Sequence, residues 1–356
     1  MVQAIRITLF AVFLMVVFSA CNDEPPAPAP PSLEIRGADM SFLPEVRQSG
    51  LVIRNSAGQP EDMLVTLNNA GVNVVRLRLW NNPATPVSGF ESVRALSAEI
   101  KNRGMKVMIT LHYSDSWADP GKQSKPALWQ ALPFNVLLDS VYQFTRKVAG
   151  TIRPEYISIG NEINGGLLWP DGRSNQPAQM RAILERGIQA VRRYSPESKI
   201  ILHYAGHRGA NNFFSGLAGL DYDIIGISYY PKWHGANLTE LRQNLGQTAL
   251  KNQKPIFIAE VSYPFTLDWN DWTNNVVGET AHLVDGFPAT PAGQRDFLKR
   301  IRDLITDVPN GLGLVYWGAE WISYRGPQAT DGSTWENQAL WDFNNRALPA
   351  ITVFAE

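Results

Sequence analysis

Two glutamates, Glu162 and Glu260, come at the ends of short apolar runs rich in β-branched residues. Two carboxyl groups can share acid/base catalysis and nucleophilic attack, provided that one holds a proton and the other is ionised. Glycoside hydrolysis with retention needs such a pair about 5–5.5 Å apart. Asn161 precedes Glu162, and its amide can donate a hydrogen bond to a sugar hydroxyl beside the reacting carbon. A lone glutamate in such a place more often caps a helix or pairs with arginine, but the pair favours catalysis.

Other polar and aromatic side chains gather at the ends of similar runs. An indole can stack on the apolar face of a sugar while polar neighbours bind the hydroxyl groups, although packing in the core explains any single tryptophan equally well. We expect Trp317 to form the floor of the sugar subsite before the scissile bond. The predicted substrate-binding residues are Asp39, Arg76, Arg78, His112, Asp115, Trp117, Asn161, Trp169, Tyr229, Trp233 and Trp317.

The sequence predicts neither a metal nor a cofactor. Among the five histidines, only His203 and His207 are spaced as paired ligands, and no third ligand is evident. The acidic segment 268–271 offers few oxygen atoms for calcium. Cys21 is the single cysteine, which excludes a disulfide within the chain and a cysteine-based metal cluster.

The elements that would position these residues alternate along the chain. Eight apolar runs are separated by segments with apolar residues every three or four positions, the spacing of amphipathic helices. This alternation predicts an α/β fold, a single-domain (β/α)8 TIM barrel with its active site at the carboxyl ends of the strands. An open doubly wound sheet would need a glycine-rich loop after the first strand, which is missing. The expected strands are residues 35–40, 72–80, 105–112, 156–161, 199–204, 224–229, 255–261 and 312–317, and the expected helices include residues 92–103, 134–149, 178–194, 238–253 and 292–307.

The N-terminal segment differs in composition from this domain. Residues 1–20 hold one arginine and an apolar run too short to span a membrane, which is typical of an export signal. Ser19 and Ala20 before Cys21 resemble a bacterial lipobox, with Phe18 in place of leucine; a buried free cysteine is the alternative. Residues 21–31 continue as a Pro-rich spacer, and residues 32–356 form the catalytic domain. We expect an exported bacterial lipoprotein anchored in a membrane at the cell surface or periplasmic face.

The charge balance excludes one class of partner. The chain has 32 Lys and Arg against 33 Asp and Glu, a formal net charge of -1, and no basic tract stands out. Nucleic-acid binding depends on clustered positive charge, so we expect no nucleic-acid partner. We expect the protein to be a monomer.

Several long motifs follow one another in the chain, at residues 37–39, 75–81, 112–123, 160–163, 166–170, 228–235, 260–264 and 335–340. Together they resemble glycoside hydrolase family 53, the arabinogalactan endo-1,4-β-galactanases, from about Gly37 to Leu348. The resemblance implies that Glu162 is the general acid/base, that Glu260 is the nucleophile, and that the substrate is the β-1,4-galactan of pectic side chains, as polysaccharide or oligosaccharides. One departure is Gly318, where the family usually has glutamate after the tryptophan; Glu320 is a candidate replacement.

Two other functions remain open at this point. Another retaining hydrolase of the same clan, acting on β-mannan or β-glucan, would share Glu162 and Glu260 but not the motif at residues 112–123. A glycan-binding lipoprotein without catalysis would not need both glutamates. An assay of purified residues 32–356 on galactan, mannan and glucan separates the three.

Overall fold

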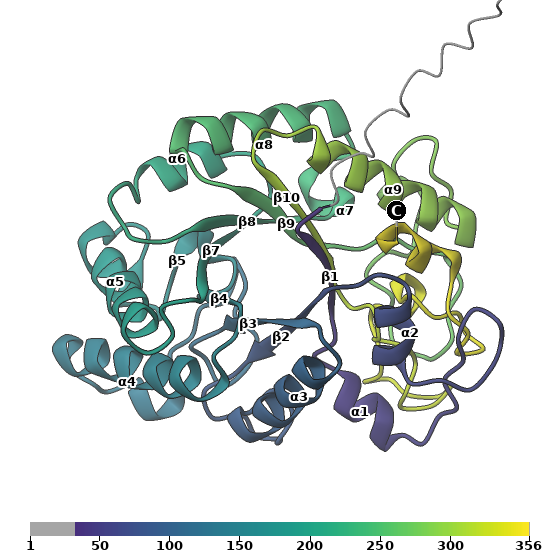
Figure 1. The fold of residues 1–356 in the computed structure, drawn as a ribbon, viewed down its shortest axis with the longest axis horizontal. Coiled ribbons are helices and arrows are strands. Elements are labelled where there is room, and N and C mark those ends of the chain that lie inside the picture. Colours follow the sequence, from purple (N-terminus) through teal and green to yellow (C-terminus); the bar gives the residue numbers. More distant parts are fainter. Residues whose placement is uncertain (1–32, 356) are drawn as a thin grey trace, which may run out of the picture. The chain divides into compact units, whose positions relative to one another are not determined.

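Apolar, β-branched runs form the parallel strands of a closed barrel in the computed structural model, which describes residues 33–355 (Figure 1). Neighbouring strands pair in parallel all the way round, and β1 pairs with both β2 and β10 to close the barrel. The predicted (β/α)8 barrel is therefore confirmed. The barrel strands are β1 (Ile35–Asp39), β2 (Val74–Leu79), β3 (Lys106–Leu111), β4 (Tyr156–Ile159), β7 (Lys199–Ala205), β8 (Ile224–Tyr229), β9 (Ile256–Val261) and β10 (Gly311–Tyr316).

The helices surround the barrel and cover its outer face (Figure 1). The expected long helices are present, with ends shifted by a few residues. They are α3 (Phe90–Asn102), α4 (Phe134–Ile152), α5 (Pro177–Tyr194), α8 (Leu238–Asn252) and α9 (Pro291–Thr306). Four shorter helices have too few residues to show a clear periodicity in sequence: α1 (Leu43–Gln48), α2 (Met63–Asn69), α6 (Ala210–Ser215) and α7 (Pro231–His234). Within residues 33–355, no helix is long and apolar enough to cross a membrane.

The barrel interior changes character along the strands. Its amino-terminal half is filled by an apolar cluster to which every barrel strand contributes: Ile35, Val74, Met108, Tyr156, Ile201, Ile224, Phe257, Ala259 and Val315. Because alternate strand residues face the same side, the next inward positions include Arg76, Ser158 and His203. Polar groups therefore lie above an apolar floor, at the carboxyl end of the barrel.

Loops build up the same carboxyl end. A short hairpin of β5 (Gly166–Leu167) and β6 (Gly172–Arg173) follows β4. A long loop, residues 262–290, follows β9, and residues 317–355 follow β10 with only the 3₁₀ turns Glu336–Gln338 and Pro349–Phe354. Loops on this face of a TIM barrel carry its active site.

Candidate active site

Two backbone irregularities turn the glutamates inward. Gly160 has φ 88°, and a Cβ there would lie 2.6 Å from Ile163 Cγ2, so this turn requires glycine. Glu162 itself has φ 48°, a left-handed conformation that costs energy in a non-glycine residue and is found mostly at functional sites. In β9, Ile258 pairs with Ile227 but Glu260 pairs with Ser228, so Ala259 forms a bulge. Strict alternation from the inward Ala259 would have pointed Glu260 outward, and the bulge re-aims it.

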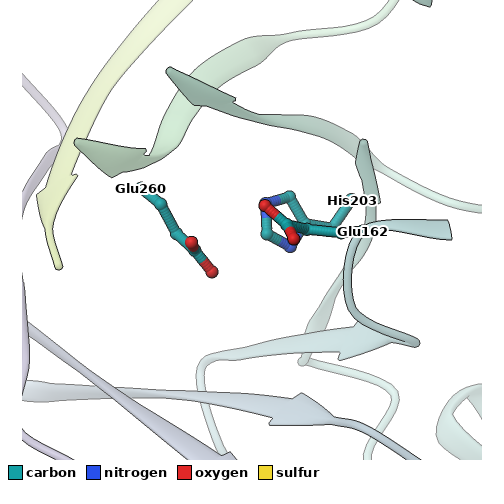
Figure 2. A group of neighbouring side chains, drawn as sticks. All are labelled: Glu162, His203 and Glu260. Carbon is teal, nitrogen blue, oxygen red and sulfur yellow. The ribbon is translucent and has the colours of Figure 1, made fainter. Parts of the chain in front are cut away.

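The two carboxyl groups meet inside the barrel. Figure 2 shows Glu162 and Glu260 reaching toward each other from opposite walls, with His203 beside Glu162. One oxygen of each glutamate and one ring nitrogen of His203 lie within 4.8 Å of one another. The glutamates are 8% and 5% exposed, respectively. This separation fits a retaining pair and is too short for an inverting pair, which needs about 6.5–9.5 Å for a water between the carboxyl groups.

Glu260 has strong hydrogen-bond donors on both of its oxygens. Arg76 Nη2 lies 2.6 Å from Oε1 in a buried ion pair, and the Tyr230 hydroxyl donates to Oε2 at 2.7 Å. Burial raises the pKa of Glu260, whereas the Arg76 charge and the Tyr230 hydrogen bond act in the opposite direction. These two donors therefore favour the ionised form that a nucleophile requires.

Arg76 connects the groups around Glu260. Its guanidinium donates to Thr110 Oγ1 at 3.0 Å, Asp39 Oδ2 at 2.7 Å and Asn161 Oδ1 at 2.9 Å, besides Glu260. Although burial disfavours its charge, the carboxylates of Glu260 and Asp39 raise the pKa of Arg76. It is therefore a permanent cation with satisfied hydrogen bonds.

Glu162 has a different environment. Its Oε1 lies 2.6 Å from Ser228 Oγ, and among residues 33–355 no cation is bonded to its carboxyl group. Burial, followed by the negative charge of Glu260, raises the pKa of Glu162 to about 8, against the hydrogen bond that Ser228 would donate to an ionised Glu162 and the charge of Arg76. Glu162 is thus protonated near neutral pH, as a general acid must be.

Both ring nitrogens of His203 are already engaged. Nδ1 lies 3.0 Å from Asn161 Oδ1, and Nε2 lies 2.8 Å from Ser228 Oγ. Glu260 likewise has a partner on each oxygen. Although Glu162, His203 and Glu260 are close enough to hold a metal ion, these hydrogen bonds and the adjacent Arg76 cation oppose that role.

A cavity of about 610 Å³ opens above the two carboxyl groups. Of the predicted site residues, it is lined by Arg76, Arg78, His112, Trp117, Asn161, Glu162, Trp233, Glu260 and Trp317. The structure also brings in residues that the sequence reasoning did not assign: Asp119, Asn164, Tyr230, His234, Trp321 and Trp335. Trp321 lies just beyond the end of β10, and Trp335 begins the motif at residues 335–340. Strand periodicity does not place either ring in the cavity, because both lie in an irregular segment.

Aromatic rings form one wall of this cavity. Trp317 packs edge-on against Trp335 with their centroids 4.7 Å apart, and Trp321 lies parallel to Trp335 at 6.2 Å. The buried guanidinium of Arg78 lies over the rings of both Phe42 and Trp117, 3.9 and 4.3 Å from their centroids. Burial lowers the pKa of Arg78 to about 10, so it remains charged at neutral pH. Flat apolar faces beside fixed donors suit a sugar.

Four predicted site residues do not line the cavity. Asp39 is buried behind Arg76, and Asp115 accepts hydrogen bonds from the backbone of Asn82 and Ala127. The Tyr229 hydroxyl donates to the carbonyl of Gly235, and Trp169 donates from Nε1 to the carbonyl of Gly165. These five contacts hold other parts of the site in place. The partners are Arg76, Asn82, Ala127, Gly235 and Gly165.

Glu320 also lies outside the cavity. It is fully buried, and its Oε1 accepts a hydrogen bond from the backbone N–H of Phe42 at 2.5 Å. Burial raises its pKa well above the usual value. Glu320 therefore supports the chain after β1 and does not replace the glutamate that is missing at Gly318.

Comparisons with known proteins agree with this geometry. The profile of Glycosyl hydrolase family 53 matches residues 35–354. An arabinogalactan endo-beta-1,4-galactanase of Cellvibrio japonicus is 33% identical over 339 residues, 89% of this chain and 89% of that protein. The GH53 catalytic domain of Ignisphaera aggregans has a TM-score of 0.87 at 36% identity, covering 92% of this chain and 97% of that chain. A structure of fungal beta-1,4-galactanases has a TM-score of 0.81 at 29% identity, covering 91% of this chain and 100% of that chain.

Proposed function

The chain belongs to glycosyl hydrolase family 53, and on this basis we infer that it is an endo-β-1,4-galactanase that cleaves β-1,4-galactan with retention. The observation that supports the reaction most directly is the buried pair, Glu162 and Glu260, with oxygens within 4.8 Å. We assign general acid/base catalysis to Glu162 and nucleophilic attack to Glu260.

In the first step, Glu260 attacks the anomeric carbon while protonated Glu162 gives its proton to the leaving glycosidic oxygen. The attack forms a galactosyl ester on Glu260 and breaks the bond to the leaving sugar chain. Arg76 and Tyr230 keep Glu260 ionised before the attack. Asn161 uses one amide hydrogen for the carbonyl of Ala118, which leaves the other for a sugar hydroxyl.

In the second step, Glu162 takes a proton from water, and the resulting hydroxide displaces Glu260 from the anomeric carbon. The negative charge of Glu260 disappears while the ester exists. Because that charge helps to raise the pKa of Glu162, its loss lowers this pKa and makes the carboxylate available as a base. Two inversions at the same carbon give net retention.

The aromatic wall supports an extended carbohydrate substrate. Trp317 and Trp335 lie beside the catalytic glutamates, and Trp233 is 53% exposed at the edge of the cavity. We propose that Trp317 stacks on the sugar before the scissile bond and that Trp233 contacts a sugar further along the chain. Arg78, His112 and Trp117 line the same cavity and complete the proposed substrate contacts.

A panel of polysaccharides tests this function. The purified protein should release oligosaccharides from β-1,4-galactan and leave β-mannan and β-glucan largely intact. Proton NMR during the first minutes should show the β-anomer of the new reducing end before mutarotation. Cleavage of mannan or glucan in preference to galactan would contradict the substrate, and an initial α-anomer would contradict the mechanism.

We also propose that the enzyme is exported and attached to a membrane through a lipidated Cys21. Cys21 lies outside the described residues, and the proposal rests on the apolar run before it and the Pro-rich spacer after it. Mass spectrometry of the N-terminus should find a mature protein that begins with a lipid-modified Cys21. A different first residue, or an unmodified cysteine, would contradict the anchor.

A further inference from the structure

The inference concerns the side chains behind Glu162 and rests on the proposed acid/base role of that residue. Asn161, His203 and Ser228 lie in a continuous row that ends at the Glu162 carboxyl group. The successive contacts are 3.0 Å, 2.8 Å and 2.6 Å. His203 and Ser228 are 1% and 0% exposed, so bulk solvent does not reach their side chains.

The orientation of the Asn161 amide is determined by its other neighbours. Its Oδ1 lies 2.9 Å from Arg76 Nη2, and its Nδ2 donates to the carbonyl of Ala118 at 2.8 Å. A guanidinium has no acceptor, so the amide oxygen must face Arg76. The same oxygen faces His203 Nδ1. Since this oxygen carries no hydrogen, His203 must donate one from Nδ1.

The other nitrogen of His203 is then an acceptor. Burial and the nearby Arg76 charge lower the pKa of His203 well below its usual value, so the ring is neutral and holds a single N–H. With that hydrogen on Nδ1, Nε2 has only a lone pair. Ser228 must therefore donate its hydroxyl hydrogen to His203 Nε2.

A serine hydroxyl has one hydrogen, and Ser228 already donates it in the hydrogen bond to His203. The contact of 2.6 Å between Ser228 Oγ and Glu162 Oε1 then needs a hydrogen from Glu162. We propose that His203 and Ser228 are positioning residues that select the protonated acid form of Glu162 before the first step. If Glu162 loses its proton, Ser228 must turn to the carboxylate and leave His203 Nε2 without a donor.

Other charged and titratable groups also face Glu162. They are Glu260 on β9, Arg76 on β2, Asp119 after β3 and Tyr230 after β8. All four remain when Ser228 or His203 is replaced. A change in the proton affinity of Glu162 in such variants can therefore be assigned to the row of hydrogen bonds.

The test is the alkaline limb of kcat/KM against pH on a galactan oligosaccharide, since this limb reports the free enzyme's general acid. Ser228→Ala should move the limb about one pH unit lower, which is about a tenfold loss at high pH relative to the wild type. The protonated form loses two hydrogen bonds, from Glu162 to Ser228 and from Ser228 to His203, whereas the carboxylate form loses only the one that Ser228 donates to it. If Ser228 simply donates to the carboxylate, the same substitution would move the limb upward, so a limb that rises or stays in place overturns the proposal.

His203→Ala provides the second variant, because it frees Ser228 to donate to the carboxylate and should lower the limb in the same direction. Ser158→Ala is the matched control: Ser158 is equally buried inside the barrel, but its hydroxyl donates to the carbonyl of Gly160. Its limb should stay within about 0.2 unit of the wild type. A wild type without galactan hydrolysis would contradict the proposed function, whereas a normal wild type with an unmoved limb in Ser228→Ala would contradict only this row.

Discussion

Glu162 and Glu260 face each other in the same barrel, at similar burial, but their immediate partners differ. Glu260 has a cation on one oxygen and a tyrosine hydroxyl on the other, whereas Glu162 is bonded to a single serine. Burial raises the pKa of both groups. The comparison teaches that burial makes a proton available to the pair, while the local partners decide which carboxyl group keeps it.

Replacing each glutamate in turn tests this difference most strongly. Glu162→Gln and Glu260→Gln should each lower kcat on galactan by about 10³-fold or more, because each removes a chemical step. Azide should then distinguish them. With Glu260→Ala and an activated aryl substrate it should give the inverted glycosyl azide, and with Glu162→Ala the retained one. The same anomer from both variants, identified by NMR, would refute the division of roles.

Tyr230→Phe removes the hydrogen bond that the Tyr230 hydroxyl donates to Glu260. Loss of a hydrogen bond to a charged group should lower kcat by about 10- to 100-fold. Because the Tyr230 hydrogen bond lowers the pKa of Glu260, the acid limb of kcat/KM should move to higher pH. The neighbouring Tyr229→Phe is the control, since its hydroxyl donates to the carbonyl of Gly235. Equal pH profiles for the two variants would show that Tyr230 does not influence the ionisation of Glu260.

Removing the charge of Asp119 should change the pKa of Glu162 by a smaller amount. The wild type should lose about tenfold in kcat/KM per pH unit above about 8, where Glu162 loses its proton. Asp119 raises the pKa of Glu162, so Asp119→Asn should move this limb to lower pH, by less than one unit. The acid limb should be unchanged. A shift of both limbs together would show that the charge of Asp119 affects the pKa values of both Glu162 and Glu260, against the difference drawn between them.

The dependence of stability on pH should be stronger for Glu162 than for Glu260. The pKa of folded Glu162, about 8, exceeds its ordinary value of 4.5, so folding binds a proton between these values and stability falls as pH rises through that range. Glu162→Gln should therefore raise Tm by a few degrees at pH 9 and leave it unchanged at pH 4. The pKa of folded Glu260 is raised as well, but Arg76 and Tyr230 oppose the rise, so Glu260→Gln should change Tm at pH 9 by less than Glu162→Gln does. Calorimetry across this pH range checks both.

The sequence was sufficient to predict the barrel and to place both glutamates at the carboxyl end of its strands. Strand and helix periodicities are local properties, and the strand ends of a TIM barrel share one rim, so residues at those ends could be grouped without a structure. Ser228 could have been found in the same way, since it lies four residues after the inward-facing Ile224. The contacts of Trp321 and Trp335 with Trp317 could not be predicted, because they depend on the course of an irregular loop.

Periodicity alone would have misplaced Glu260. Two-residue alternation in β9 directs it toward the surrounding helices, and only the bulge at Ala259 turns it into the barrel beside Arg76. A bulge depends on pairing with both neighbouring strands, which are distant in sequence. The protonation of Glu162 likewise depends on residues distant in sequence, namely His203 on β7, Ser228 on β8 and Glu260 on β9. Local residue type thus determined the elements and the candidate pair, whereas long-range packing decided the different surroundings of the two carboxyl groups, on which the proposed division into acid and nucleophile rests.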